Sequence, residues 1–175
     1  SCWSGPPILR SNTPTSASAG PLVAMERPVE MFRLFGQRAG FFTLGLARNF
    51  DEVVAVESNP VAAGDLEVNL REAEIDNVRV LVDSVEAAMD DIDIARLRPD
   101  RVVVDPPRTG LGEAVAERIA DFEPERIIYL SCDPATLARD LSVLDHRGYR
   151  LIGAECFDLF PQTPHVEMLA VVDRG

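Results

Sequence analysis

One cysteine of this sequence stands where it could act as a nucleophile. Cys132 follows a hydrophobic run, residues 126–130, that reads as a buried β-strand, and Pro134 opens a helix two residues later. Proline is favoured at the first position of a helix because its missing N–H would have no partner there. Cys132 is therefore expected at the carboxyl end of a strand and beside a helix N-terminus, a setting that favours the nucleophilic thiolate. A lone cysteine at a strand end is more often buried and inert, so the flanking residues must decide between the two interpretations.

Those flanking residues belong to the second of three segments that follow one another in order: Asp105–Arg108 (DPPR), Ser131–Leu141 (SCDPATLARDL) and Phe160–Glu167 (FPQTPHVE). The three resemble motifs of the RNA 5-methyluridine methyltransferases, which depend on S-adenosylmethionine (SAM). In that family the first motif lies on the preceding strand, the second carries the nucleophile and the third carries the catalytic base. The resemblance runs from about Gly40 to Val172, and three ordered motifs are specific where one would be weak.

The resemblance implies covalent catalysis. Uracil C5 is not nucleophilic enough to take up a methyl group unaided, but a thiolate that adds to C6 turns the ring into an enolate whose C5 can attack. The C5 proton must then be removed by a base so that the thiol can leave. Cys132 matches the nucleophile and Glu167 the base. The target uracil must be unpaired, or flipped out of a duplex, to be reached.

The resemblance also implies where SAM would bind. Gly40 ends the loop before the first predicted helix, and Phe41 begins that helix. Glu57 ends a β-branched run, where a carboxylate can accept hydrogen bonds from both ribose hydroxyls of an adenosine cofactor. Asp83 falls where the family contacts the adenine amino group. Asp105 falls beside the cofactor and the target base.

The loop before Gly40 departs from the family pattern. The usual acidic residue at the strand end falls on Leu34, and the first glycine of the Gly-x-Gly pair falls on Arg38. Glycine is needed there for a tight turn and for close approach of the cofactor to the backbone. A non-catalytic remnant or binding module of the same fold, with weakened SAM binding, therefore stays open as an alternative. A cysteine hydrolase or redox protein is a further alternative, but no Cys–His–Asn arrangement or CxxC supports it.

The elements that must position these residues alternate along the chain. The runs that read as parallel strands are residues 53–57, 78–82, 101–104 and 126–130. Helices are predicted to begin near residues 41, 59, 111 and 134. Two last strands, residues 149–158 and 166–172, should pair antiparallel across a short turn. This order predicts an α/β fold of the class I SAM-dependent methyltransferase type, Rossmann-like, with a mainly parallel sheet, helices on both faces and a C-terminal antiparallel strand.

Residues 1–30 differ from the rest. They hold five prolines and five serines without a clear period, and we expect an irregular segment or linker ahead of a catalytic domain at residues 31–175. The Phe-x-Gln-x-Asn motif with which the family contacts SAM is not found there, and the N-terminal RNA-binding domain of many members has no room. The chain is therefore expected to be the C-terminal catalytic portion of such an enzyme.

Composition narrows the partners. The 175 residues, 46% of them hydrophobic, suffice for one domain with a core. The sequence has no apolar run of membrane-spanning length and no signal-peptide pattern, and its three cysteines lack metal or disulfide spacing, so we expect a cytoplasmic protein. The net charge is −12 and every basic side chain is arginine. Such a surface repels phosphate, so a tRNA or rRNA substrate would need a further domain or a local arginine patch for much of its affinity.

Overall fold

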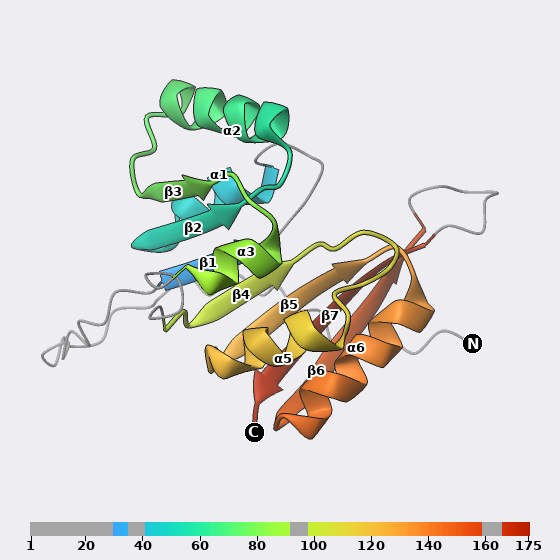
Figure 1. Cartoon of the computed structure of the whole chain (residues 1–175). Coiled ribbons are helices and arrows are strands. Elements are labelled where there is room, and N and C mark those ends of the chain that lie inside the picture. Colours follow the sequence, from blue (N-terminus) through green and yellow to red (C-terminus); the bar gives the residue numbers. More distant parts are fainter. Residues whose placement is uncertain (1–29, 35–40, 92–97, 159–165) are drawn as a thin grey trace, which may run out of the picture.

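Strands and helices alternate along most of the chain. The computed structural model describes residues 30–34, 41–91, 98–158 and 166–175 (Figure 1). The strands are β1 (Glu30–Leu34), β2 (Glu52–Val56), β3 (Val78–Leu81), β4 (Arg101–Val104), β5 (Arg126–Ser131), β6 (Tyr149–Phe157) and β7 (Glu167–Arg174). The helices are α1 (Phe41–Ala47), α2 (Pro60–Glu72), α3 (Val85–Asp90), α5 (Glu113–Asp121) and α6 (Pro134–His146). None of the helices in these ranges is long and apolar enough to cross a membrane.

The strands of the described residues form one mixed sheet in the order β3-β2-β1-β4-β5-β7-β6. The first five are parallel to one another, as the helical crossovers between them require. β7 runs antiparallel to both β5 and β6, so the C-terminal hairpin inserts its second strand beside the parallel part. The mainly parallel sheet with an antiparallel strand near the C-terminus, predicted from the sequence, is confirmed.

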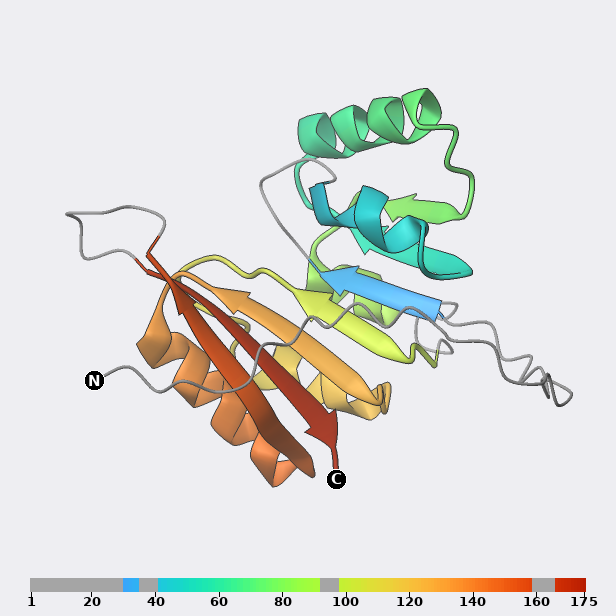
Figure 2. The same cartoon turned by 180° about the vertical axis from the view of Figure 1, so that it is seen from behind.

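Helices cover both faces of the sheet, as predicted. Val54 and Val56 of β2 pack into the larger core, which α3, α5 and α6 share. Val53 and Ala55 alternate with these two residues along the strand and pack on the other face, in two smaller clusters with α1 and α2. Figure 2 shows α1 in front of the sheet with α5 and α6 behind it. β2 is therefore buried on both faces, which explains its almost unbroken run of valines.

One helix begins later than the sequence predicts. The pattern places its start at Leu111, whereas α5 begins at Glu113. Gly112 before it has φ of +77°, a left-handed conformation outside the helix. The N–H of Leu111 donates instead to the carboxylate of Asp140, 2.7 Å away. The linker expected at residues 1–30 lies outside the described residues, except for Glu30.

An ion pair closes the ladder between β5 and β7. Arg126 and Asp173 are opposite each other in the pairing, and Nε and Nη2 of the guanidinium donate to the two carboxylate oxygens over 2.6 and 2.7 Å. This bidentate hydrogen bonding holds the pKa of Asp173 below its ordinary value of 3.8. A carboxylate with a lowered pKa contributes stability above its unfolded pKa and loses it as the pH falls through the folded pKa.

We expect Asp173→Asn to lower the free energy of unfolding by roughly 0.5 kcal/mol at pH 7, since solvent screens a partly exposed pair. Urea denaturation from pH 7 downward should show the parent's advantage in full until about pH 4 and a narrowing difference below it. A difference that stayed constant across that range would mean that lost packing, rather than lost charge, destabilises the variant.

Candidate active site

The carboxyl edge of the parallel strands gathers the residues singled out in the sequence. Glu57 follows β2, Asp83 lies two residues beyond β3, Asp105 follows β4 and Cys132 follows β5. Glu167 begins β7, and because β7 runs antiparallel its start lies at the same edge. In open α/β sheets ligands bind outside the carboxyl ends of the strands. The fold therefore brings one thiol and four carboxylates to the edge where a ligand is expected.

The pairing of β5 with β7 brings the end of β5, which Cys132 follows, to the start of β7, where Glu167 lies. The ladder ends with Ser131 opposite Met168, so Cys132 and Glu167 are the next residues beyond its last pair. Residues that are directly opposite in an antiparallel pair point to the same face, with Cβ atoms about 4.5–5.5 Å apart. Tyr129 and Ser131 are buried on the face toward α6, so if the alternation of β5 continues, Cys132 is expected on the opposite face.

Hydrogen bonds hold the turn around Cys132 on both sides. The hydroxyl of Ser131 donates to the carbonyl of Asp133 at 2.9 Å and accepts from its N–H at 3.1 Å. The carboxylate of Asp133 caps α6 by accepting from the N–H groups of Ala135 and Thr136, both at 2.9 Å. These bonds, that from Thr136 first, lower the pKa of Asp133. Cys132 itself is a half-buried free thiol, so a substrate atom can approach it.

The carboxylates at the ends of β2 and β3 are also oriented by backbone N–H groups. Glu57 is half-buried, and its Oε1 accepts from the N–H of Asn59 at 2.9 Å. Its own N–H donates to the carbonyl of Leu81, which ties the end of β2 to β3. Asp83 is exposed and accepts from the N–H of Ser84 at 2.8 Å. Both acids thus stand on adjoining strand ends, where acceptors for hydroxyl and amino groups are needed.

Of the two cofactor residues predicted at the start of the first helix, the structure describes one. Phe41 is the first residue of α1, so the expected helix start is confirmed. Gly40 lies outside the described residues, together with Arg38 and the segment 159–165 of the closing motif. Their predicted roles stay predictions.

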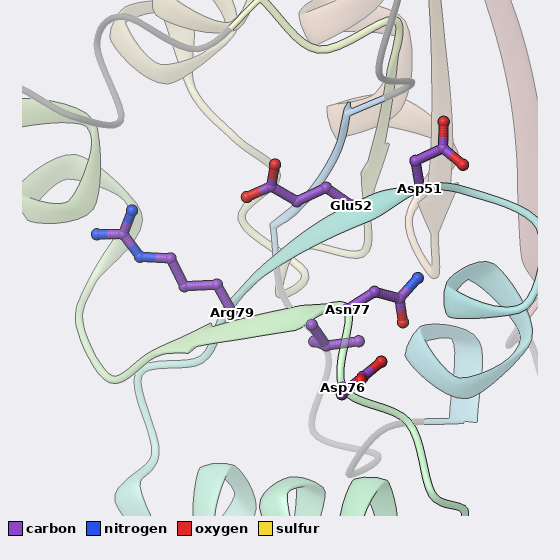
Figure 3. A pocket seen from close by; sticks show the side chains of 6 residues that line it. Asp51, Glu52, Asp76, Asn77 and Arg79 are labelled. Carbon is purple, nitrogen blue, oxygen red and sulfur yellow. The ribbon is translucent and has the colours of Figure 1, made fainter.

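A hollow of about 340 Å³ lies at the opposite edge of the sheet (Figure 3). It is lined at the amino ends of β2 and β3 by Asp51, Glu52, Asp76, Asn77, Val78 and Arg79. The amide of Asn77 is already engaged, because it donates to the carbonyls of Ala47 and Phe50, each at 2.8 Å. The amide of Asn77 therefore has a structural role in the wall of the hollow. None of the predicted site residues at the carboxyl edge lines the hollow.

Sequence reasoning overlooked Asp140. This carboxylate is fully buried, although it was read only as part of the nucleophile motif. Its position could have been noticed, because it falls three residues after Leu137 and four before Leu144, the other buried residues of α6. A charged side chain at the core-facing position of a helix needs several hydrogen-bond donors around it.

The comparisons with known proteins show the family and the fold. The family model described as tRNA (Uracil-5-)-methyltransferase matches residues 25–174. The chain belongs to the tRNA (uracil-5-)-methyltransferase family. The family resemblance inferred from the three motifs is therefore confirmed.

Among curated relatives of the family, the 23S rRNA (uracil(1939)-C(5))-methyltransferase RlmD of Alkalilimnicola ehrlichii is 45% identical over 136 residues, which cover 77% of this chain and 30% of the relative. An RNA methyltransferase of Gloeobacter violaceus is also 45% identical over 136 residues, covering 78% and 29%. The chain thus spans about three tenths of the length of the curated relatives it matches.

Solved structures show the same fold. The Pyrococcus abyssi tRNA (uracil-54, C5)-methyltransferase, in complex with S-adenosyl-L-homocysteine, has a TM-score of 0.69 and 32% identity, covering 84% of this chain and 34% of its own. The precorrin-6y C5,15-methyltransferase of Geobacter metallireducens has a TM-score of 0.67 at 16% identity, covering 87% and 83%. The sheet is therefore that of the class I SAM-dependent methyltransferases, as predicted.

The register at the carboxyl edge can be tested without any substrate. In a Cys2→Ser, Cys156→Ser background, Glu167→Cys should form a disulfide with Cys132 under mild oxidation, because directly opposite Cβ atoms lie close to disulfide range. Mass spectrometry of the cross-linked peptides measures it. Val166→Cys is the matched control: one residue away, its side chain points to the other face, and it should not cross-link. Equal cross-linking of both variants would contradict the register.

Proposed function

We propose that this chain is the catalytic portion of a SAM-dependent RNA methyltransferase that makes 5-methyluridine in tRNA or rRNA through a covalent Cys132–C6 adduct. The observation that carries the proposal is the end of the β5–β7 ladder at Ser131 and Met168, because Cys132 and Glu167 are the residues next to that last pair at the carboxyl edge. Asp105 supports it, because the β4–β5 register makes it level with Leu130, two residues before Cys132. Family membership supplies the reaction class.

The donor set at the edge fits the cofactor. Glu57 and Asp83, on neighbouring strand ends, are acceptors that suit the ribose hydroxyls and the amino group of adenosine. Asp105 lies between them and Cys132 in the order of the sheet, across β1 and beside β5. SAM, when bound, supplies an electrophilic methyl group to C5 of the uracil. Phe41 and Gly40 would complete the cradle at the start of α1.

The residues of this chain then carry the remaining steps. The thiolate of Cys132 forms a bond to C6, and the electrons of the C5–C6 double bond move to O4 as an enolate. After C5 has gained its methyl group, Glu167 takes the C5 proton. The C5–C6 double bond forms again and the Cys132 thiolate leaves. Both side chains must reach one base, which their positions next to the last pair of the β5–β7 ladder favour.

Ion pairing of the arginines bears on the RNA partner. In the described part of the chain, seven arginines lie within 4.0 Å of acidic oxygens: Arg101, Arg118, Arg126, Arg139, Arg147, Arg150 and Arg174. Charges neutralised in this way attract phosphate weakly, and the net charge is −12. We infer that most of the affinity for RNA comes from parts of the protein outside the residues that the structure describes.

The second candidate function is a non-catalytic module of the same fold with weakened SAM binding. The observation that favours it is Arg38 in place of the first glycine of the loop. Calorimetry with SAM separates the two candidates, because a catalytic domain must bind SAM saturably.

Glu57→Ala should weaken SAM binding by roughly 10- to 100-fold, since hydrogen bonds to a charged group contribute about 1.5–3 kcal/mol. The measurement is isothermal titration calorimetry. Glu52→Ala removes an equivalent carboxylate from the amino end of the same strand and should leave the dissociation constant unchanged. Equal affinity of Glu57→Ala and the parent would show that Glu57 does not hold the ribose.

The nucleophile and the base have distinct signatures. With SAM and tRNA or 23S rRNA transcripts containing 5-fluorouracil, the parent should form a stable covalent adduct, because after methyl transfer the fluorine at C5 cannot be removed as a proton is. Cys132→Ala should form none, whereas Cys156→Ala, which removes the other described free thiol, should behave as the parent. Glu167→Gln should accumulate a methylated adduct with ordinary RNA, since methyl transfer precedes proton removal. Denaturing gels and mass spectrometry detect each species.

Full methyl transfer by Cys132→Ala would overturn the covalent mechanism. Rapid turnover by Glu167→Gln would assign the base elsewhere. Adduct formation by the parent is the required control. The transcript that forms more adduct identifies the RNA class.

A further inference from the structure

Asp140 of α6 is a buried carboxylate whose donors come from three separate segments. Its side chain is fully buried. Oδ2 accepts from the hydroxyl of Tyr129 on β5 at 2.6 Å and from the N–H of Leu111, ahead of α5, at 2.7 Å. Oδ1 accepts from Nε and Nη2 of Arg139 at 2.9 and 2.8 Å. One carboxylate thus ties together β5, α6 and the segment that follows β4.

The segment after β4 is held at a second point. Nη2 of Arg139 also donates to the carbonyl of Thr109 at 2.8 Å, so residues 109–111 are hydrogen-bonded to both Arg139 and Asp140. Gly110 between them has φ of +74°. A Cβ there would lie 2.5 Å from Oδ2 of Asp140 and 2.7 Å from Nη2 of Arg139. The backbone therefore packs directly on the carboxylate, at a distance that only glycine permits.

The donors of Asp140 suit an ionised carboxylate. Tyr129 is itself buried, and burial first, then the bond to Asp140, raises its pKa well above the ordinary value, so its hydroxyl stays protonated and donates. A buried charge is unfavourable unless it is fully hydrogen-bonded, and a leucine could fill the same space without that penalty. Such a group is useful where it specifies one arrangement of the segments that it joins.

These segments carry two residues of the proposed site. Tyr129 lies on β5, three residues before Cys132, and α6 begins two residues after Cys132. The segment bonded to Asp140 and Arg139 begins at Thr109, four residues after Asp105. Asp105 and Cys132 are thus anchored to the same buried carboxylate from neighbouring strands.

We propose that Asp140 is a positioning residue that fixes the segment after Asp105 against the strand and helix on either side of Cys132, and so sets the spacing of Asp105 and Cys132. The importance of that spacing rests on the proposed function. The hydrogen-bonded group of Asp140, Tyr129, Arg139 and the backbone of residues 109–111 is called the Asp140 clamp below.

Two matched pairs of variants test the clamp. Tyr129→Phe removes a buried hydroxyl from it, and Tyr149→Phe removes an equally buried hydroxyl that donates to the carbonyl of Pro124 at 2.9 Å, outside the clamp. Gly110→Ala and Gly112→Ala both place a side chain at a positive φ, of +74° and +77°, but nothing lies within 4 Å of a Cβ at Gly112. Each pair therefore shares its general destabilisation and differs in its effect on the clamp.

Three measurements are made on the full 175-residue chain: the melting temperature, the hydrogen exchange of the Leu111 amide by NMR, and the rate constant of adduct formation with saturating 5-fluorouracil RNA. Tyr129→Phe, Gly110→Ala and Asp140→Asn should speed exchange at Leu111 and slow adduct formation by roughly 10- to 100-fold, as small misplacements of reacting groups do. Tyr149→Phe and Gly112→Ala should also lower the melting temperature, Gly112→Ala by less than Gly110→Ala because its Cβ meets nothing within 4 Å, and should leave the other two quantities near the parent values.

The outcomes are separable. Unchanged exchange at Leu111 in the clamp variants would overturn the clamp itself. Faster exchange with adduct rates equal to those of the controls would overturn the positioning role and leave Asp140 a structural residue. A parent that forms no adduct contradicts the proposed function instead, and the exchange data then decide alone whether Asp140 holds residues 109–111. Should Asp140→Asn not fold, the two matched pairs give the same answers.

Discussion

Six residue pairs join β5 to β7, from Arg126 opposite Asp173 to Ser131 opposite Met168, and the candidate site depends on their register. Side chains alternate between the faces of a sheet, so a slip of one residue would move Glu167 to the face opposite that of Cys132. Two features oppose such a slip. Ala170 and Val172 are buried on the face toward the larger core, and the bidentate pair of Arg126 and Asp173 matches only this alignment.

The parallel part of the sheet contributes a different constraint. Each helical crossover brings the chain back to the amino edge of the sheet before the next parallel strand begins. The residue that follows each strand from β2 to β5 therefore lies at the carboxyl edge. Short polar contacts then orient these residues: Asn59 donates its N–H to Glu57, and Asp133 caps the helix that follows Cys132. The acids and the thiol need no long-range contact with one another to be assembled.

Packing alone does not account for the segment between β4 and α5. Residues 109–111 contact a buried carboxylate as well as the apolar core, and α5 starts two residues late because Gly112 has a non-helical φ of +77°. Apolar contacts tolerate small shifts, whereas hydrogen bonds to a buried charge are lost when a donor moves by a fraction of an ångström. A polar contact of this kind suits a segment that must keep one position relative to its neighbour.

Much of this protein follows from its sequence alone. The β-branched runs and the caps at Asn59 and Asp133 predict the strands and helices, and strand ends locate Glu57, Asp83, Asp105 and Cys132, because these features depend on neighbouring residues. The three motifs identify the family, while the roles of the predicted site residues, Gly40 and Phe41 included, stay predictions. Only the tertiary structure shows that β7 lies between β5 and β6, which brings Glu167 to Cys132 across 35 positions of the chain. Strand order and the hydrogen-bond donors of Asp140 from β5 and from the segment before α5 depend on contacts between distant segments, and no local pattern encodes those.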